Sequence, residues 1–127
     1  MLPILGSALS GMDAATKRID VSAQNIVNVN SVGTKSEQTS YKAVEAIQTS
    51  DGNGAPTVTV RERTPSTVTT YAPNSLLANA DGLVESPNVD IASELVSQDV
   101  AVNSYKASVK MFQVWDEMQK ATLDITS

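Results

Sequence analysis

The chain has 127 residues, with no histidine, no cysteine and a formal charge of −5. These counts exclude a histidine general base, a cysteine nucleophile, a disulfide and the usual zinc sites built from nitrogen and sulfur ligands. The acidic balance argues against nucleic acid and anionic membrane surfaces, because both require a basic patch. The length fits one domain. With few aromatic side chains (4%), the core is expected to be modest and to be completed by a partner.

Breaker residues divide the chain into three regions. We expect an N-terminal helix within residues 1–30, a small β-containing or loop region over residues 31–87, and a C-terminal helix within residues 88–127. The predicted fold class is therefore mainly α. Two long terminal helices would form a coiled-coil-like pair, joined by a small irregular β-containing middle region.

In the first region, apolar positions recur at alternating spacings of four and three, which forms a heptad seam. The seam consists of Leu5, Leu9, Met12, Thr16, Ile19, Ala23 and Ile26. Beside it, Ala8, Ala15 and Ser22 are seven apart and would allow a close helix neighbour. Gly33 is expected to stop the helix. The pattern leaves open an amphipathic helix packed on its own domain and a strand of a coiled coil.

Two features of the chain concern membranes. The first lysine is Lys17, so the N-terminal segment lacks the basic region of a cleaved secretory signal, and none is expected. No apolar run reaches the roughly 18 residues of a transmembrane helix, so direct membrane insertion is not expected either.

The middle region alternates in short bursts. Residues 57–63 and 67–71 have a period of two and predict strands, with a turn at residues 64–66. Residues 41–47 fit a third strand or a short helix, and residues 73–87 are expected to be irregular. The sequence Asp-Gly-Asn-Gly at residues 51–54 predicts a turn. A calcium loop is not predicted there, because the later acidic ligands of such a loop are missing. Arg61 and Arg63 share a strand face, which favours a surface ladder or a salt bridge between subunits.

The last region contains neither glycine nor proline from residue 88 to residue 125, which predicts a long helix capped by Asn88 or Asp90. Helical periodicity places two apolar stripes on nearly opposite faces. The first stripe is Ile91, Leu95, Val102, Tyr105, Val109 and Phe112. The second stripe is Val96, Val100, Ala107, Met111, Val114, Met118 and Ile125. One flank between them is charged, and the other carries Ser97, Ala101, Ser104 and Ser108.

Two opposed stripes need two neighbours. The middle region could cover one of them, or a second copy or another subunit could, and we favour the latter, which describes an assembly protein. We expect subunit interfaces at Leu5, Leu9, Met12, Ile19, Ile26, Ile91, Leu95, Val96, Val100, Val102, Tyr105, Val109, Met111, Phe112, Val114 and Met118. No catalytic, cofactor-binding or metal-binding residues are predicted, because no nucleophile, phosphate-loop or dinucleotide motif occurs. The chain is not expected to be an enzyme.

Several segments carry a resemblance to a known family. At the N-terminus these are Ser7–Met12 (SALSGM) and Arg18–Asn30 (RIDVSAQNIVNVN). In the second half they are Tyr71–Asn74, Leu77–Ala78, Asp81–Val84, Pro87–Asp90, Glu94–Val96 and Ser104–Ala107. The combination resembles bacterial flagellar rod and hook proteins over about three-quarters of the chain.

The resemblance implies a structural subunit of the flagellar basal body. Its terminal helices would pair and polymerise into the axial drive shaft that crosses the periplasm and transmits torque. Its partners would be copies of itself, other rod proteins and the flagellar type III export apparatus, which exports such subunits without a cleaved signal. The alternative is a small acidic helical binding module, such as an export chaperone that covers an amphipathic segment of its partner.

Overall fold

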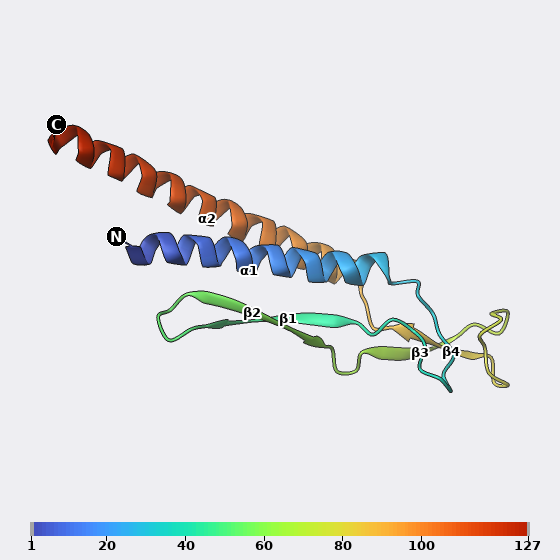
Figure 1. Cartoon of the computed structure of the whole chain (residues 1–127). Coiled ribbons are helices and arrows are strands. Elements are labelled where there is room, and N and C mark those ends of the chain that lie inside the picture. Colours follow the sequence, from blue (N-terminus) through green and yellow to red (C-terminus); the bar gives the residue numbers. More distant parts are fainter. Residues whose placement is uncertain (1, 127) are drawn as a thin grey trace.

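The computed structural model describes residues 2–126 and confirms the expected fold class. Helix α1 (Leu2–Val27, 26 residues) and helix α2 (Ile91–Thr126, 36 residues) run in opposite directions side by side. Between them in sequence lie two antiparallel hairpins, β1 (Val44–Ser50) with β2 (Pro56–Glu62), and β3 (Thr67–Tyr71) with β4 (Leu83–Pro87). The C-terminal end of α2 extends past the start of α1 (Figure 1).

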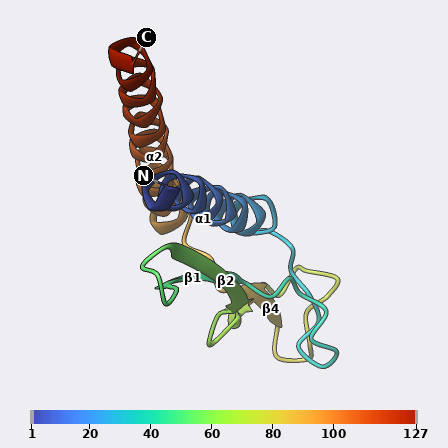
Figure 2. The same cartoon turned by 60° about the vertical axis from the view of Figure 1, so that its left-hand side comes forward.

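Helix α1 lies in the middle of the molecule. It packs against α2 on one side and against the β1–β2 hairpin on another, as the two views in Figures 1 and 2 agree. The fully buried apolar side chains are few and mostly alanine, namely Ala8, Ala14, Ala15, Val21, Ala43, Val84 and Ala101. The core is therefore modest, as expected, and it consists mainly of alanine side chains.

Helix α2 begins where its capping sequence predicts. The side chain of Asp90 accepts a hydrogen bond from the Ala92 backbone amide at 3.2 Å, and its carbonyl accepts one from Glu94 at 2.9 Å. Asp90 is therefore the N-cap, because it satisfies amides that the first turn leaves without helical partners.

Helix α1 ends earlier than its sequence suggested. Its last residue is Val27, and Gly33 lies beyond the end in a buried bridge to β4. The Gly33 amide donates to the Glu85 carbonyl at 2.9 Å, and Glu85 returns the bond at 3.0 Å. A Cβ at Gly33 would collide with the backbone of Thr39 and Ser40. Close backbone approach, rather than a helix stop, is what requires glycine here.

The β1–β2 hairpin confirms a strand after Tyr41 and the turn at residues 51–54. Strand β1 is shifted a few residues toward the C-terminus and pairs from Val44 with Glu62 to Ser50 with Pro56. In the turn, the Asp51 carboxylate accepts from the amides of Asn53 and Ala55, both at 2.8 Å. Gly54 supplies the positive φ of 82° that this tight connection needs.

The expectation that residues 73–87 are irregular is wrong at their end. Residues 83–87 form β4, which pairs with β3 from Thr67 with Pro87 to Tyr71 with Leu83. This strand is short and ends in proline, so its sequence lacks the alternation that marks a strand. Pairing with β3 and burial of Val84, which is 1% exposed, hold it in place.

Candidate assembly surface

The contact between the two long helices is lined by small residues. Ala8, Ala15 and Ser22 on α1 are all buried, as is Ala101 on α2. A Cβ added at Gly11 would meet the side chain of Ser108, so the helix backbones approach closely there. The row of small residues predicted to allow a close neighbour therefore does so, and we call it the small-residue seam.

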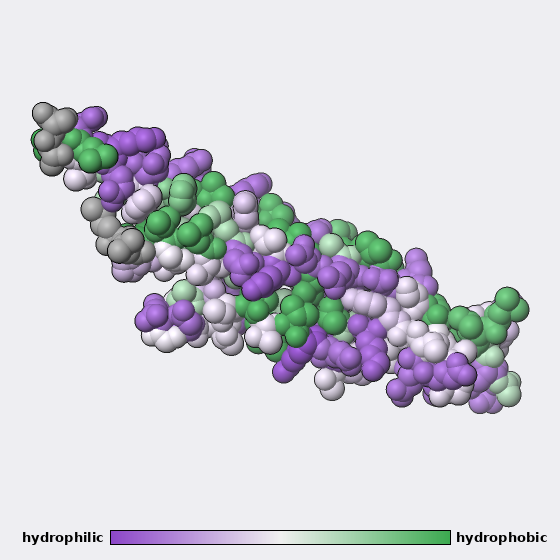
Figure 3. Space-filling model, in the orientation of Figure 1, coloured by the Kyte–Doolittle hydropathy of each residue, from purple (hydrophilic) through white to green (hydrophobic). Residues whose placement is uncertain are grey.

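Helix α2 faces α1 with the flank of small residues that contains Ala101 and Ser108. Neither of its two apolar stripes forms this contact. In the second stripe, Val96, Val100, Met111, Val114 and Met118 are 47–65% exposed. In the first stripe, Ile91, Leu95, Tyr105 and Phe112 are 38–51% exposed, while Val102 and Val109 are half-buried. Figure 3 shows hydrophobic side chains along this helix at the surface. Both stripes thus retain uncovered apolar area within the single chain.

The apolar seam of α1 lies at the side of the helix contact and not at its centre. Leu5, Met12, Ile19 and Ile26 are half-buried, and Leu9 is 51% exposed. Small side chains allow helix backbones to approach more closely than leucine and isoleucine do, so the alanine row occupies the contact and the seam is displaced to its edge. The heptad pattern was therefore a poor guide to the contact face within the chain.

An apolar groove opens where the start of α1 lies beside the second half of α2. Ile4 lines it from α1, and Met111, Val114, Trp115 and Met118 line it from α2, with Lys110 at its side. Its volume is about 370 Å³. Three of the predicted interface residues, Met111, Val114 and Met118, thus share one concave apolar site.

A cluster of buried and half-buried polar side chains, which we call the polar junction, joins both helices to the sheet region. It consists of Asn25, Tyr41, Arg63 and Glu94. Asn25 is fully buried, and its amide donates to the Val44 carbonyl at 2.8 Å and to Glu94 Oε1 at 3.1 Å. Its Oδ1 accepts from the Tyr41 hydroxyl and the Val44 amide, both at 3.1 Å. All of its hydrogen-bonding capacity is therefore used.

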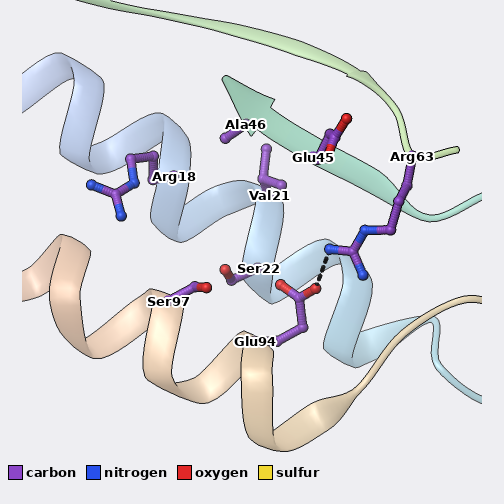
Figure 4. A pocket seen from close by; sticks show the side chains of 8 residues that line it. All are labelled: Arg18, Val21, Ser22, Glu45, Ala46, Arg63, Glu94 and Ser97. Carbon is purple, nitrogen blue, oxygen red and sulfur yellow. Dashed lines mark hydrogen bonds and ion pairs between the residues drawn. The ribbon is translucent and has the colours of Figure 1, made fainter. Parts of the chain in front are cut away.

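The charge of Glu94 is balanced by Arg63. Glu94 is 4% exposed, and its Oε1 accepts from Arg63 Nη2 at 2.7 Å (Figure 4). The other guanidinium nitrogen, Nη1, donates to the Asn88 carbonyl at 2.9 Å. Arg63 therefore ties the chain beyond β2 to the first turn of α2. The expected surface ladder is confirmed for Arg61, which pairs across the hairpin with Glu45 at 2.8 Å, whereas Arg63 pairs instead with Glu94 inside the molecule.

The surroundings of Tyr41 shift the pKa of its side chain. Burial raises the pKa of its phenol above 10.0, the negative charge of Glu94 raises it further, and Arg63 lowers it. The junction therefore favours the neutral, hydrogen-bonding form of the tyrosine.

The polar junction was not predicted from the sequence. Its members are 69 positions apart at the extreme, from Asn25 to Glu94. Asn25 lies outside the apolar seam of the first helix, so the heptad pattern does not mark it as a buried position. A buried polar residue requires a partner, but no local pattern identifies which residue that is.

Within residues 2–126, no group of three or more acidic, histidine or cysteine side chains is placed to hold a metal ion. Among the helices described, none is long and apolar enough to cross a membrane.

Comparisons with known proteins define the class. The family described as flagellar basal body rod FlgEFG protein C-terminal matches residues 80–125, which cover β4 and nearly all of α2. The C-terminal helix is thus of the kind found in flagellar rod proteins.

Relatives that match over nearly the whole chain identify the family within this class. The flagellar basal-body rod protein FlgC of Salmonella typhimurium is 30% identical over 98% of this chain and 97% of its own length. FlgC of Escherichia coli O157:H7 is 32% identical with the same coverage, and FlgC of Aquifex aeolicus is 30% identical over 94% of this chain and 92% of its own. The chain belongs to the FlgC family of flagellar basal-body rod proteins, which confirms the resemblance seen in its motifs.

Proposed function

We propose that this chain is a structural, non-enzymatic subunit of the flagellar basal-body rod. In this proposal residues 1–30 and 88–127 contribute helices to the axial core, and copies and other rod proteins cover the exposed stripes. The observation that carries it is the uncovered apolar area along α2, where Val96, Val100 and Met111 remain 47–65% exposed beside a family assignment to the rod. Apolar patches of this extent mark interaction surfaces in soluble proteins.

The mechanism is mechanical. Subunits related by a rotation and a rise, with contacts that do not close on themselves, build an open helical assembly. Burial of both stripes between neighbours would give it stiffness, and stiffness allows torque to pass from motor to hook. Export through the flagellar type III apparatus, without a cleaved signal, and a location in the rod across the periplasm complete the proposal.

Charge substitutions on the stripes test this proposal. Val100→Asp and Met111→Asp each place a carboxylate at a surface that becomes buried on assembly, where an unpaired charge is strongly unfavourable. We expect cells carrying either variant to lose motility, and their purified basal bodies to lack this chain. Asn103→Asp is the matched control, because it adds the same charge at an exposed position of α2, one turn from Asp99 and from Lys106 on the charged flank. Working flagella with Val100→Asp and Met111→Asp would show that the second stripe is not an interface.

The acidic composition, with its low pI, also fits a second candidate function, that of an export chaperone. Such a protein would remain in the cytoplasm and would form compact soluble dimers on its own. Its recovery only from the cytoplasm, and never from purified basal bodies, would favour the chaperone and overturn the rod assignment.

A further inference from the structure

Two apolar features lie at opposite ends of the elongated molecule. One is the groove between the start of α1 and the second half of α2, lined by Met111, Val114, Trp115 and Met118. The other, which we call the tip, is the connection between β3 and β4, where Leu76 is completely exposed (103%) and Leu77 is 41% exposed. The ends can be followed in Figure 1, and Figure 3 shows hydrophobic surface at the tip. One molecule cannot bring its own tip to its own groove.

The tip is an ordered projection. Backbone bonds join Ser75 to Ala72 at 3.0 Å, Ala78 to Ser75 at 3.1 Å and Ala72 to Gly82 at 2.9 Å. The Asn79 side chain closes the base by accepting from the amides of Asp81 and Leu83 at 3.0 and 2.9 Å. A projection held in this way loses little conformational freedom when it docks, which favours binding.

Charge distinguishes the two ends. The tip carries Asp81, and the sequence contains no lysine or arginine between Arg63 and Lys106. The groove has Lys110 at its side, and Lys106 lines the adjoining hollow with Lys110. An acidic apolar projection and a basic-edged apolar groove are complementary, and such complementarity orients partners.

We infer that the groove is occupied by the tip of a second copy of this chain. Leu76 and Leu77 of one copy enter between Met111, Val114 and Met118 of the next, and Asp81 approaches Lys110. The contact uses two different surfaces, so it is heterologous and can extend from copy to copy without closing. This inference rests on the proposed rod function for its biological setting, but it names a contact that the helix stripes alone do not require.

Cross-linking of the purified full-length chain tests it directly, because the chain has no native cysteine. Asn74→Cys places a thiol beside the tip and leaves both leucines intact. Ala121→Cys places one next to Met118, and both positions are exposed. The two variants are mixed and treated with a short bismaleimide. We expect the mixed product to predominate over products joining like positions.

Two further variants keep the result specific. Leu76→Asp, combined with Asn74→Cys, should abolish the mixed product without unfolding, because Leu76 is fully exposed. Val27→Cys, 81% exposed at the end of α1, is a control thiol of high accessibility and should not cross-link preferentially to Ala121→Cys. A statistical mixture of products, or one dominated by tip-to-tip linkage, would overturn the inference.

The same thiols in cells separate this inference from the proposed function. If the chain is present in basal bodies but Ala121→Cys links only to a different protein, the second copy is the wrong occupant while the rod assignment stands. If the chain is absent from basal bodies, the rod assignment fails, and the purified-chain experiment still decides whether tip and groove meet.

Discussion

The side chains of Asn25 on α1 and Glu94 on α2 meet inside the molecule, with Asn25 Nδ2 donating to Glu94 Oε1 at 3.1 Å. Both are almost completely buried, and they lie where the end of one helix crosses the start of the other. The small-residue seam alone would allow the two helices to slide along each other, since alanine side chains do little to distinguish one register from the next. A buried polar pair is strongly register-dependent, because a shift of one turn would leave both groups without partners. This pair therefore fixes how the two helices align.

Removing the Asn25 amide should destabilise the chain strongly. In Asn25→Ala, the Val44 amide and carbonyl and the Glu94 carboxylate each lose a hydrogen bond, so we expect unfolding to become easier by about 1–3 kcal/mol. Chemical denaturation monitored by circular dichroism measures this. Asn28→Ala is the control, because the two bonds of its side chain, to the Gln24 carbonyl and from the Ser31 hydroxyl, are both exposed. Equal effects of the two substitutions would show that the junction does not hold the helices.

The two arginines near the end of β2 should behave very differently. Arg63→Met leaves the buried Glu94 carboxylate without its counter-charge. Loss of one partner of a fully buried pair costs about 3–5 kcal/mol, and because Arg63 is itself only half-buried we expect a loss at or below the lower end of that range. Arg61→Met breaks an exposed pair with Glu45, which is worth about 0–1 kcal/mol. Denaturation midpoints of both variants provide the comparison. A loss for Arg63→Met no larger than that for Arg61→Met would contradict the buried role of the ion pair.

Two glycines of α1 should respond differently to substitution. Gly6 has open space around it, so Gly6→Ala should stabilise the chain by roughly 0.5–1 kcal/mol through helix propensity. Gly11 faces Ser108 across the seam, where a methyl group would displace the serine hydroxyl from its bond to the Ser104 carbonyl. Gly11→Ala should therefore gain less, and Gly11→Leu should destabilise by about 1–3 kcal/mol through overpacking. Thermal melting of the three variants tests how closely the two helices approach at Gly11. A wild-type melting temperature for Gly11→Leu would refute the close approach.

Alkaline pH should weaken the fold through Tyr41. Its raised pKa means that the folded chain holds the phenolic proton more tightly than the unfolded chain does. The corresponding stability is complete below pH 10.0 and is lost as the pH rises through the folded-state pKa. Tyr41→Phe should reduce the alkaline loss of stability, and it should also cost about 0.5–1.5 kcal/mol at neutral pH from the lost bond to Asn25.

The measurement is the free energy of unfolding at several pH values, beside an absorbance titration of the phenolate. Tyr71→Phe serves as control, because Tyr71 is 70% exposed and lies on the far hairpin. An identical alkaline dependence for wild type and Tyr41→Phe would remove Tyr41 from the explanation.

Much of the fold could be predicted because its signals are local. The absence of glycine and proline after residue 88 defines α2, and the Asp51 turn defines the first hairpin. The contact face was predicted only in part. The spacing of Ala8 and Ala15 indicated a close helix neighbour, and this is confirmed. Large residues dominate a hydrophobic pattern, however, so Leu5 and Ile19 were expected at a contact too, whereas they lie half-buried at its edge. Strand β4 and the polar junction depend on partners distant in sequence, which no local pattern contains.

That the exposed stripes are subunit interfaces remains a prediction. Their exposure, however, can be explained from the sequence. Both stripes of α2 are spaced correctly for burial, and α1 covers only the flank between them. Residues 2–126 contain no third long helix that could cover them. The pattern therefore indicated surplus apolar surface correctly, without indicating which face α1 would take.

The small-residue seam reverses the usual tolerance of a protein to mutation. In most folds the large buried side chains are the restricted positions, and small surface residues vary freely. In this chain, Ala8, Ala15 and Ala101 have no room to grow, so even a modest enlargement such as Ala15→Val should disturb the helix pair. Met118 and Val96, by contrast, could become polar with little effect on the isolated chain. A deep mutational scan of stability would therefore mark the alanines as the core, whereas a scan of motility would add the large side chains that the stability scan had passed over.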